Sequence, residues 1–193
     1  MRAPFPALIS VLALLAVAPA AIAQTAKAET AKAETPSQTT KAAAPPAAAI
    51  AGGPGTVTLR GLDGRSETLT LAQIAALPHQ AVSMIHDGKI TVYSGPTLAD
   101  LLRDLDAPMG ARMHGQAVND VLFITAADNY RVVLTLAEVD PGVHKDARAI
   151  LADKADGLPL DPHEGPFRLV VDGDLKPARS ARSVVEIELK HLP

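Results

Sequence analysis

Short apolar runs separated by turn residues recur along the chain from residue 56 to its end. Their length and their content of valine, isoleucine and leucine are typical of strands. The expected strands are 56–60, 79–86, 89–93, 121–126, 130–134, 149–152, 167–171 and 184–189. Asp87-Gly88 and Asp128-Asn129 stand between consecutive runs. Both dipeptides favour tight hairpin turns, and Asn129 suits a type I′ turn.

Helical patterns are fewer. Thr70 precedes 71–77 and Thr97 precedes 98–105, and in both segments apolar residues recur at intervals of three or four. A threonine before such a pattern is typical of a helix N-cap. Residues 135–139 predict one more capped helical turn. Because strands are numerous, helices are short and hairpins outnumber crossovers, we predict an α+β fold with a mixed, mostly antiparallel β-sheet.

The first 54 residues have a different composition. Arg2, the apolar run 8–17 and the Ala-Ile-Ala sequence at 21–23 form the pattern of a secretory signal peptide cleaved after Ala23. An uncleaved N-terminal anchor is the alternative. Residues 24–54 contain a repeated Thr-Ala-Lys-Ala-Glu sequence and then a tract rich in proline and alanine, which favours a disordered linker.

These boundaries predict a signal peptide at 1–23, a linker at 24–54 and one folded domain at 55–193. The expected location is periplasmic or secreted. After cleavage of the signal peptide, no remaining segment is long and apolar enough to be expected to cross a membrane.

Composition excludes several function classes. The net charge is −3, aromatic residues make up 3% of the chain and tryptophan is absent, so we expect no nucleic-acid partner. Cysteine is absent, which excludes disulfides, thiolate catalysis and cysteine-ligated metals. The sequence has no P-loop, dinucleotide-binding, hydrolase or zinc-protease motif. The six histidines lack a helical i, i+4 spacing, and we interpret them as exposed loop residues rather than as a metal site.

One arginine interrupts an apolar strand. Arg168 lies within 167–171, and a cation inside a buried strand is costly unless another group pairs with it. Its guanidinium could form the wall of a pocket that binds an anion or a carboxylate. Alternatively, Arg168 is a structural charge that faces solvent or pairs with Asp153 or Glu164.

Two other polar groups are candidates. Asp128, Asn129 and Tyr130 form the tip of a hairpin, which either lines a pocket or is an ordinary turn. Arg179 and Arg182 place two positive charges opposite Asp172 and Asp174, which makes them candidates for a functional basic group. The alternative is a solvated loop with surface ion pairs.

Five segments, in their order along the chain, resemble the sulfite-oxidase-type oxidoreductase molybdopterin-binding domain family. They are SGPTLADLL at 94–102, VLFITAADNYRVVL at 121–134, ILADKADGLPL at 150–160, GPFRLVV at 165–171 and the last strand, 184–189. The resemblance covers about 56–190. The chain resembles the short, exported, stand-alone members of that family, and the resemblance implies the sulfite-oxidase-like molybdopterin-binding fold.

The chain departs from that family at the metal ligand. In the family's enzymes a cysteine thiolate ligates molybdenum within the segment that corresponds to 84–89, which here reads Met-Ile-His-Asp-Gly-Lys. The resemblance places Arg168 at a position that faces the cofactor pocket and Arg182 at that of a pterin-facing lysine. It places Ser183 at that of a tryptophan. Molybdopterin is therefore an implied cofactor, whereas the missing cysteine argues against molybdenum.

We therefore predict a non-catalytic ligand- or partner-binding module in the periplasm, with neither catalytic nor metal-ligating residues. Its partner would be an unidentified periplasmic ligand or an envelope protein. The candidate ligand-binding residues are Arg168, Arg182, Asp128, Asn129, Tyr130 and His86. Two alternatives stay open. One is a molybdopterin-dependent oxidoreductase in which His86 or Asp87 replaces the thiolate, and the other is an envelope interaction protein.

Overall fold

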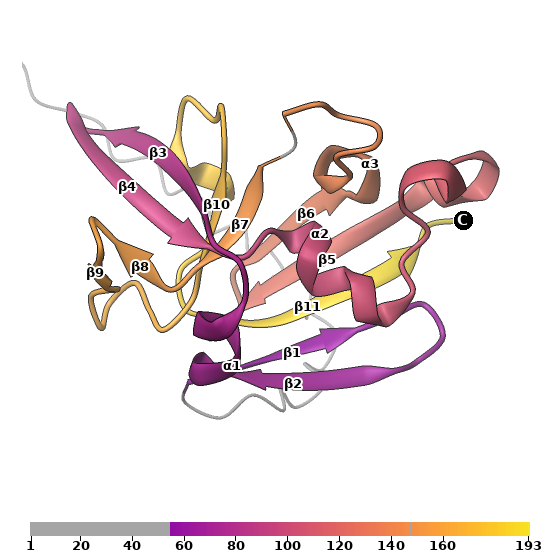
Figure 1. Cartoon of the computed structure of the whole chain (residues 1–193), viewed down its shortest axis with the longest axis horizontal. Helices are drawn as coiled ribbons and strands as arrows, with labels where there is room; N and C mark the ends of the chain where they lie inside the picture. Colours follow the sequence, from indigo (N-terminus) through magenta and orange to yellow (C-terminus); the bar gives the residue numbers. More distant parts are fainter. Residues whose placement is uncertain (1–54, 147) are drawn as a thin grey trace, which may run out of the picture. The chain divides into compact units, whose positions relative to one another are not determined.

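The computed structural model describes residues 55–146 and 148–193 (Figure 1). The predicted signal peptide and linker lie outside the described residues. The strands are β1 (Thr56–Arg60), β2 (Ser66–Thr70), β3 (Gln80–His86), β4 (Lys89–Gly95), β5 (Asp120–Ala126), β6 (Arg131–Thr135), β7 (Ala149–Ala152), β8 (Lys154–Ala155), β9 (Leu158–Pro159), β10 (Arg168–Val171) and β11 (Val184–His191). The α-helices are α1 (Leu71–Ala76), α2 (Leu98–Leu102) and α3 (Leu136–Val139). Short 3₁₀ helices are η1 (Arg103–Leu105), η2 (Gly110–Arg112), η3 (Gly115–Asn119) and η4 (Pro177–Arg179).

The largest sheet has the strand order β2-β1-β11-β5-β6. Its only parallel pair among the described strands is β1 with β11, and the other neighbours run antiparallel. Apolar residues face one another across the central strands, as Leu59 and Ile187 do. The leucines of α2 pack into the same hydrophobic cluster, and Thr97 caps this helix with its side chain. The α+β fold with mostly antiparallel sheets is thus confirmed.

A second group of strands carries the region of interest. The order β3-β4-β8-β9 forms one sheet, and β10 pairs with β7 in another. Alternate residues of β10 point to opposite sides, since Leu169 belongs to the main core and Val170 to a smaller cluster with Met84 and Tyr93. The smaller cluster joins β10 to the β3–β4 hairpin.

Gly95 allows β4 to approach β7. A Cβ atom at this position would collide with the carbonyl oxygen of Leu151, so no larger residue fits there. The backbone bond from the Leu151 N–H to the Pro96 carbonyl fixes the same crossing at 2.9 Å. The Ser-Gly-Pro sequence before α2 therefore has a packing role. It holds the β3–β4 hairpin against β7, which in turn pairs with β10.

The structure corrects several sequence-based expectations. The mostly polar strand β2 and the two-residue strands β8 and β9 were not predicted. The turn at Asp87-Gly88 has positive φ at both residues (49° and 76°), as type I′ requires, but at the Asp128-Asn129 turn only Asn129 does (67°). This second turn is therefore not type I′. No helix among the described residues has the length and apolar character to span a bilayer.

Two histidines differ in part from the expected exposed loop residues: His79 lies in a loop but is partly buried, and His191 is exposed but lies at the end of β11. Each pairs with a buried aspartate. His191 Nδ1 lies 2.7 Å from Asp120 Oδ1. His79 Nε2 lies 2.8 Å from Asp153 Oδ1, and its Nδ1 lies 2.7 Å from the carbonyl oxygen of Leu77. Asp153 thus has His79, and not Arg168, as its partner. The pair connects the end of α1 to the end of β7.

We expect His79→Ala to lower the free energy of unfolding by about 2 kcal/mol, because it leaves the buried Asp153 carboxyl without its hydrogen bond. Urea denaturation measures this change. The control is His86→Ala, whose side chain and partner Asp87 are both exposed and whose cost should stay within about 0.5 kcal/mol. Equal costs for the two variants would contradict the structural role of His79.

Candidate functional site

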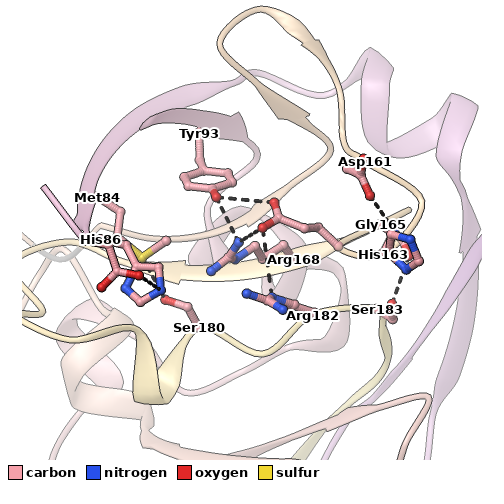
Figure 2. Close-up of polar contacts among 12 residues, drawn as sticks. Met84, His86, Tyr93, Asp161, His163, Gly165, Arg168, Ser180, Arg182 and Ser183 are labelled. Carbon is pink, nitrogen blue, oxygen red and sulfur yellow. Dashed lines mark hydrogen bonds and ion pairs between the residues drawn. The ribbon is translucent and has the colours of Figure 1, made fainter. Parts of the chain in front are cut away.

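A pocket of about 320 Å³ opens beside the β3–β4 hairpin and β10. Its lining includes His86 from the end of β3, Tyr93 from β4, Arg168 from β10, and Glu164 and Arg182 from two loops. Figure 2 shows Tyr93 and Arg182 on either side of Arg168, with His86 on a further side. The two loops are bonded together, since the Ser183 N–H donates to the Glu164 carbonyl at 2.9 Å.

The Arg168 side chain reaches this pocket although its residue is only 2% exposed. Nη1 donates to the Tyr93 hydroxyl at 2.8 Å and to Glu164 Oε1 at 2.5 Å. Nε is buried, and no described residue accepts a hydrogen bond from it. Among the described residues, the guanidinium therefore donates its hydrogen bonds through a single nitrogen, Nη1. Figure 2 shows the other terminal nitrogen pointing away from Tyr93, toward the side of Ser180 and His86.

Arg182 is the second guanidinium of the pocket. It is mostly exposed, and its Nε lies 3.9 Å from Glu164 Oε1, the oxygen that Arg168 also contacts. Glu164 therefore provides one negative charge to two guanidinium groups. Lys89, Asp156 and Asp161 also line the pocket. Both aspartates already accept backbone hydrogen bonds, from Val92 and His163.

Tyr93 completes the cluster. Its hydroxyl accepts from Arg168 and donates to Glu164 Oε2 at 3.3 Å. Burial raises the pKa of the Tyr93 phenol, and Glu164 raises it as well, whereas Arg168 and Arg182 lower it. Because the net direction is upward, the phenol stays protonated near neutral pH and acts as a hydrogen-bond donor.

A second hollow of about 220 Å³ shares Arg168 and Arg182 with the pocket. Asp128 and Tyr130 line it, together with residues of the η4 segment. The Tyr130 hydroxyl donates to the Ala178 carbonyl at 2.6 Å, which attaches the β5–β6 hairpin tip to η4. Arg168 and Arg182 thus line both hollows.

The structure places five of the six predicted residues along these two hollows. His86 lies on the pocket lining 3.4 Å from Asp87, Arg168 and Arg182 lie between the hollows, and Asp128 and Tyr130 lie in the second. Asn129 lines neither hollow, because it occupies the left-handed position of its turn. Binding by these residues stays a prediction.

Sequence reasoning missed Tyr93 and named Glu164 only as a structural partner. Tyr93 has a weak signal in the sequence, as the single aromatic residue of its strand. Arg179 and Arg182 do not act together, because Arg179 pairs with Asp174 and Glu138 at 2.6 and 2.9 Å. Asp172, which the sequence placed opposite these two arginines, pairs with Arg148 instead.

The donors present do not fit a thiolate-type molybdenum site. The segment 84–89 forms the end of β3 and a tight turn, and its donors are His86 and Asp87, whose side chains are 53% and 89% exposed. Imidazole and carboxylate are much harder ligands than thiolate. Within the described ranges, no group of three or more His, Cys, Asp or Glu side chains is placed to hold a metal ion.

Comparisons with known proteins agree with the fold class. The described residues form a mixed α+β domain of mostly antiparallel sheets, consistent with a sulfite-oxidase-like fold. The chain is similar to the sulfane dehydrogenase SoxCD from Paracoccus pantotrophus, with a TM-score of 0.51 and 15% sequence identity. The match covers 71% of this chain and 39% of that chain, so it spans about two fifths of the enzyme chain's length. At this identity the likeness shows the fold alone.

No family model matches the sequence, and no curated protein matches it either. The relationship to molybdopterin oxidoreductases is therefore a distant similarity of fold. What the pocket binds has to be argued from its own residues.

We expect Glu164→Gln to lower the pKa of Tyr93, because it removes the negative charge that helps to raise it. The chain contains two tyrosines, so a Tyr130→Phe background leaves Tyr93 as the only one. Titration of the tyrosinate absorbance measures the pKa. Glu138→Gln, which removes an acid that pairs with Arg179, is the control and should leave it unchanged. An unchanged or higher pKa in Glu164→Gln would contradict the arrangement.

Proposed function

We propose that this chain is an exported, non-catalytic binding module whose folded domain holds a small anion beside β3, β4 and β10. The observation that carries this proposal is Arg168. Its side chain is buried, the residue lines two hollows, and its Nε has no hydrogen-bond acceptor among the described residues. Buried polar groups are rarely left unpaired, so an unused donor on a pocket-lining arginine favours a binding role for this side chain, although Nε itself is covered in the free protein.

The charges support an anion as that ligand. Arg168 and Arg182 face one shared carboxylate, that of Glu164, so these three side chains together have an excess of positive charge. The rest of the lining offsets it, because Lys89 stands with Asp156 and Asp161, and both aspartates already accept backbone hydrogen bonds. Guanidinium groups bind oxyanions and carboxylates through paired N–H donors. The Tyr93 hydroxyl provides a further donor beside them. A small anion with several oxygen acceptors suits this arrangement.

The absence of catalysis is part of the proposal. The fold is similar to that of a sulfane dehydrogenase, but the metal-binding segment of the resembled family has no thiolate here. Molybdopterin stays a candidate ligand through the family resemblance alone. An oxidoreductase with an atypical metal attachment would need His86 or Asp87 as a ligand, and both are largely exposed.

We expect methyl phosphate to bind the wild-type domain and to bind Arg182→Ala about tenfold more weakly, since one charge-assisted hydrogen bond is lost. Isothermal titration calorimetry measures both affinities. Arg168→Lys should weaken binding as well, because lysine keeps the charge but not the paired donors. Arg179→Ala is the matched control, an arginine paired with two acids outside the two hollows, and should bind as the wild type does.

Absence of methyl phosphate binding by the wild type, or equal binding by all variants, would contradict an anion site. A second measurement tests the non-catalytic part. The protein is purified from a host that makes molybdopterin, and its metal content is determined. Stoichiometric molybdenum with pterin would overturn the proposal in favour of the oxidoreductase alternative.

Export is tested separately. We expect the mature protein in the periplasmic fraction to begin at Gln24, because residues 21–23 have the small-residue pattern of a cleavage site. Intact-mass spectrometry of the fractionated cells determines the N-terminus. A chain that retains Met1 and stays in the cytoplasm would contradict export, and retention of Met1 in the membrane fraction would show an uncleaved anchor.

A further inference from the structure

Glu164 has the contacts that a bound carboxylate ligand would have. Its Oε1 accepts from Arg168 Nη1 at 2.5 Å, and its Oε2 accepts from the Tyr93 hydroxyl at 3.3 Å. Arg182 Nε lies 3.9 Å from Oε1. All four side chains belong to the same pocket lining. The carboxylate therefore lies where the donors of the proposed anion site converge.

The main chain around Glu164 is fixed, whereas its side chain is not enclosed. The Glu164 and Gly165 N–H groups both donate to the Asp161 carbonyl, at 2.8 and 2.9 Å. Ser183 bonds to both carbonyls of this pair, through its N–H to Glu164 and through its hydroxyl to Gly165 at 3.0 Å. The Glu164 side chain is 24% exposed at the pocket. It can rotate toward solvent about its own torsions while the backbone stays in place.

We propose that Glu164 is an internal competitor that occupies the anion subsite of the free protein, and that a ligand binds by displacing its carboxylate. This inference rests on the proposed function. A tethered group competes at an effective concentration that a free ligand has to exceed. The competition therefore reduces the affinity of every displacing anion by the same factor. The anions that bind the wild type well are those with the strongest intrinsic attraction to two guanidiniums, namely doubly charged oxyanion groups such as a phosphate.

Competition differs from simple repulsion in a measurable way. Suppose that Glu164 stayed in place and only repelled the ligand. Removing the Glu164 charge would then improve the binding free energy of a doubly charged anion about twice as much as that of a singly charged one. If Glu164 is displaced, its removal helps both anions by the same factor. Methyl phosphate, which is doubly charged at about pH 8 because its second pKa lies near 6, and acetate provide the two charges.

The test measures the binding of methyl phosphate and of acetate by NMR titration of the full mature protein, in the wild type and in Glu164→Gln. Glutamine keeps the size of the side chain and an oxygen acceptor but loses the charge. We expect both affinities to increase by a similar factor of about ten or more, the value of one charge-assisted hydrogen bond. Asp161→Asn is the matched control, an acid on the same pocket lining that contacts neither arginine in the structure. In this variant the increases in affinity should be small, and the increase should be larger for the doubly charged methyl phosphate than for acetate.

Two results would overturn the inference and leave the anion site intact. One is wild-type binding of methyl phosphate with no gain in Glu164→Gln. The other is an increase in affinity in Glu164→Gln that is larger for methyl phosphate than for acetate, as expected for Asp161→Asn. Failure of both anions to bind any variant would overturn the proposed function as well. Glu164→Ala provides a second variant, and it should show gains at least as large in both affinities.

Discussion

The positive charge of Arg168 inside β10 is the constraint on which the pocket depends. Transfer of an ion from water into a protein interior costs several kcal/mol unless partners replace its hydration. Here the partners are Glu164 and the Tyr93 hydroxyl, which come from a loop and from another sheet. Because the partners have to be present, the charge specifies where the 161–166 loop lies and how β4 faces β10.

The surrounding backbone is built to satisfy that requirement. The absence of a side chain at Gly95 lets β4 lie close to β7, the partner of β10, and so brings Tyr93 near Arg168. On the opposite side, Ser183 adopts a positive φ of 49° and bonds to the loop that carries Glu164. Its neighbour Arg182 thereby comes within 3.9 Å of the same carboxylate. Packing and charge pairing thus position the same few side chains.

The sequence predicts the part of this arrangement that follows from local patterns. Apolar runs located most strands, and capping threonines located the three α-helices of the described residues. Strand β2 was missed because its sequence, SETLT, is mostly polar and exposed. The partners of His79 and Tyr93 were missed because they lie 71 to 75 residues away, and no local pattern specifies such contacts. For Arg168 the sequence left two readings open, a pocket wall or a structural pair with Glu164.

The geometry makes those two readings compatible. A guanidinium has several donors, and Arg168 uses Nη1 for its structural contacts while Nε has no acceptor among the described residues. A residue that was only structural would be expected to use its buried donors, since an unpaired one costs about 1–3 kcal/mol. A residue that was only a ligand contact would leave a buried cation without a partner in the free protein. Glu164 answers the second point, because it neutralises Arg168 through Nη1 when no ligand is present and lies at the position that we propose for an anion. On this proposal, the same ion pair stabilises the free protein and also sets the affinity that a ligand has to exceed.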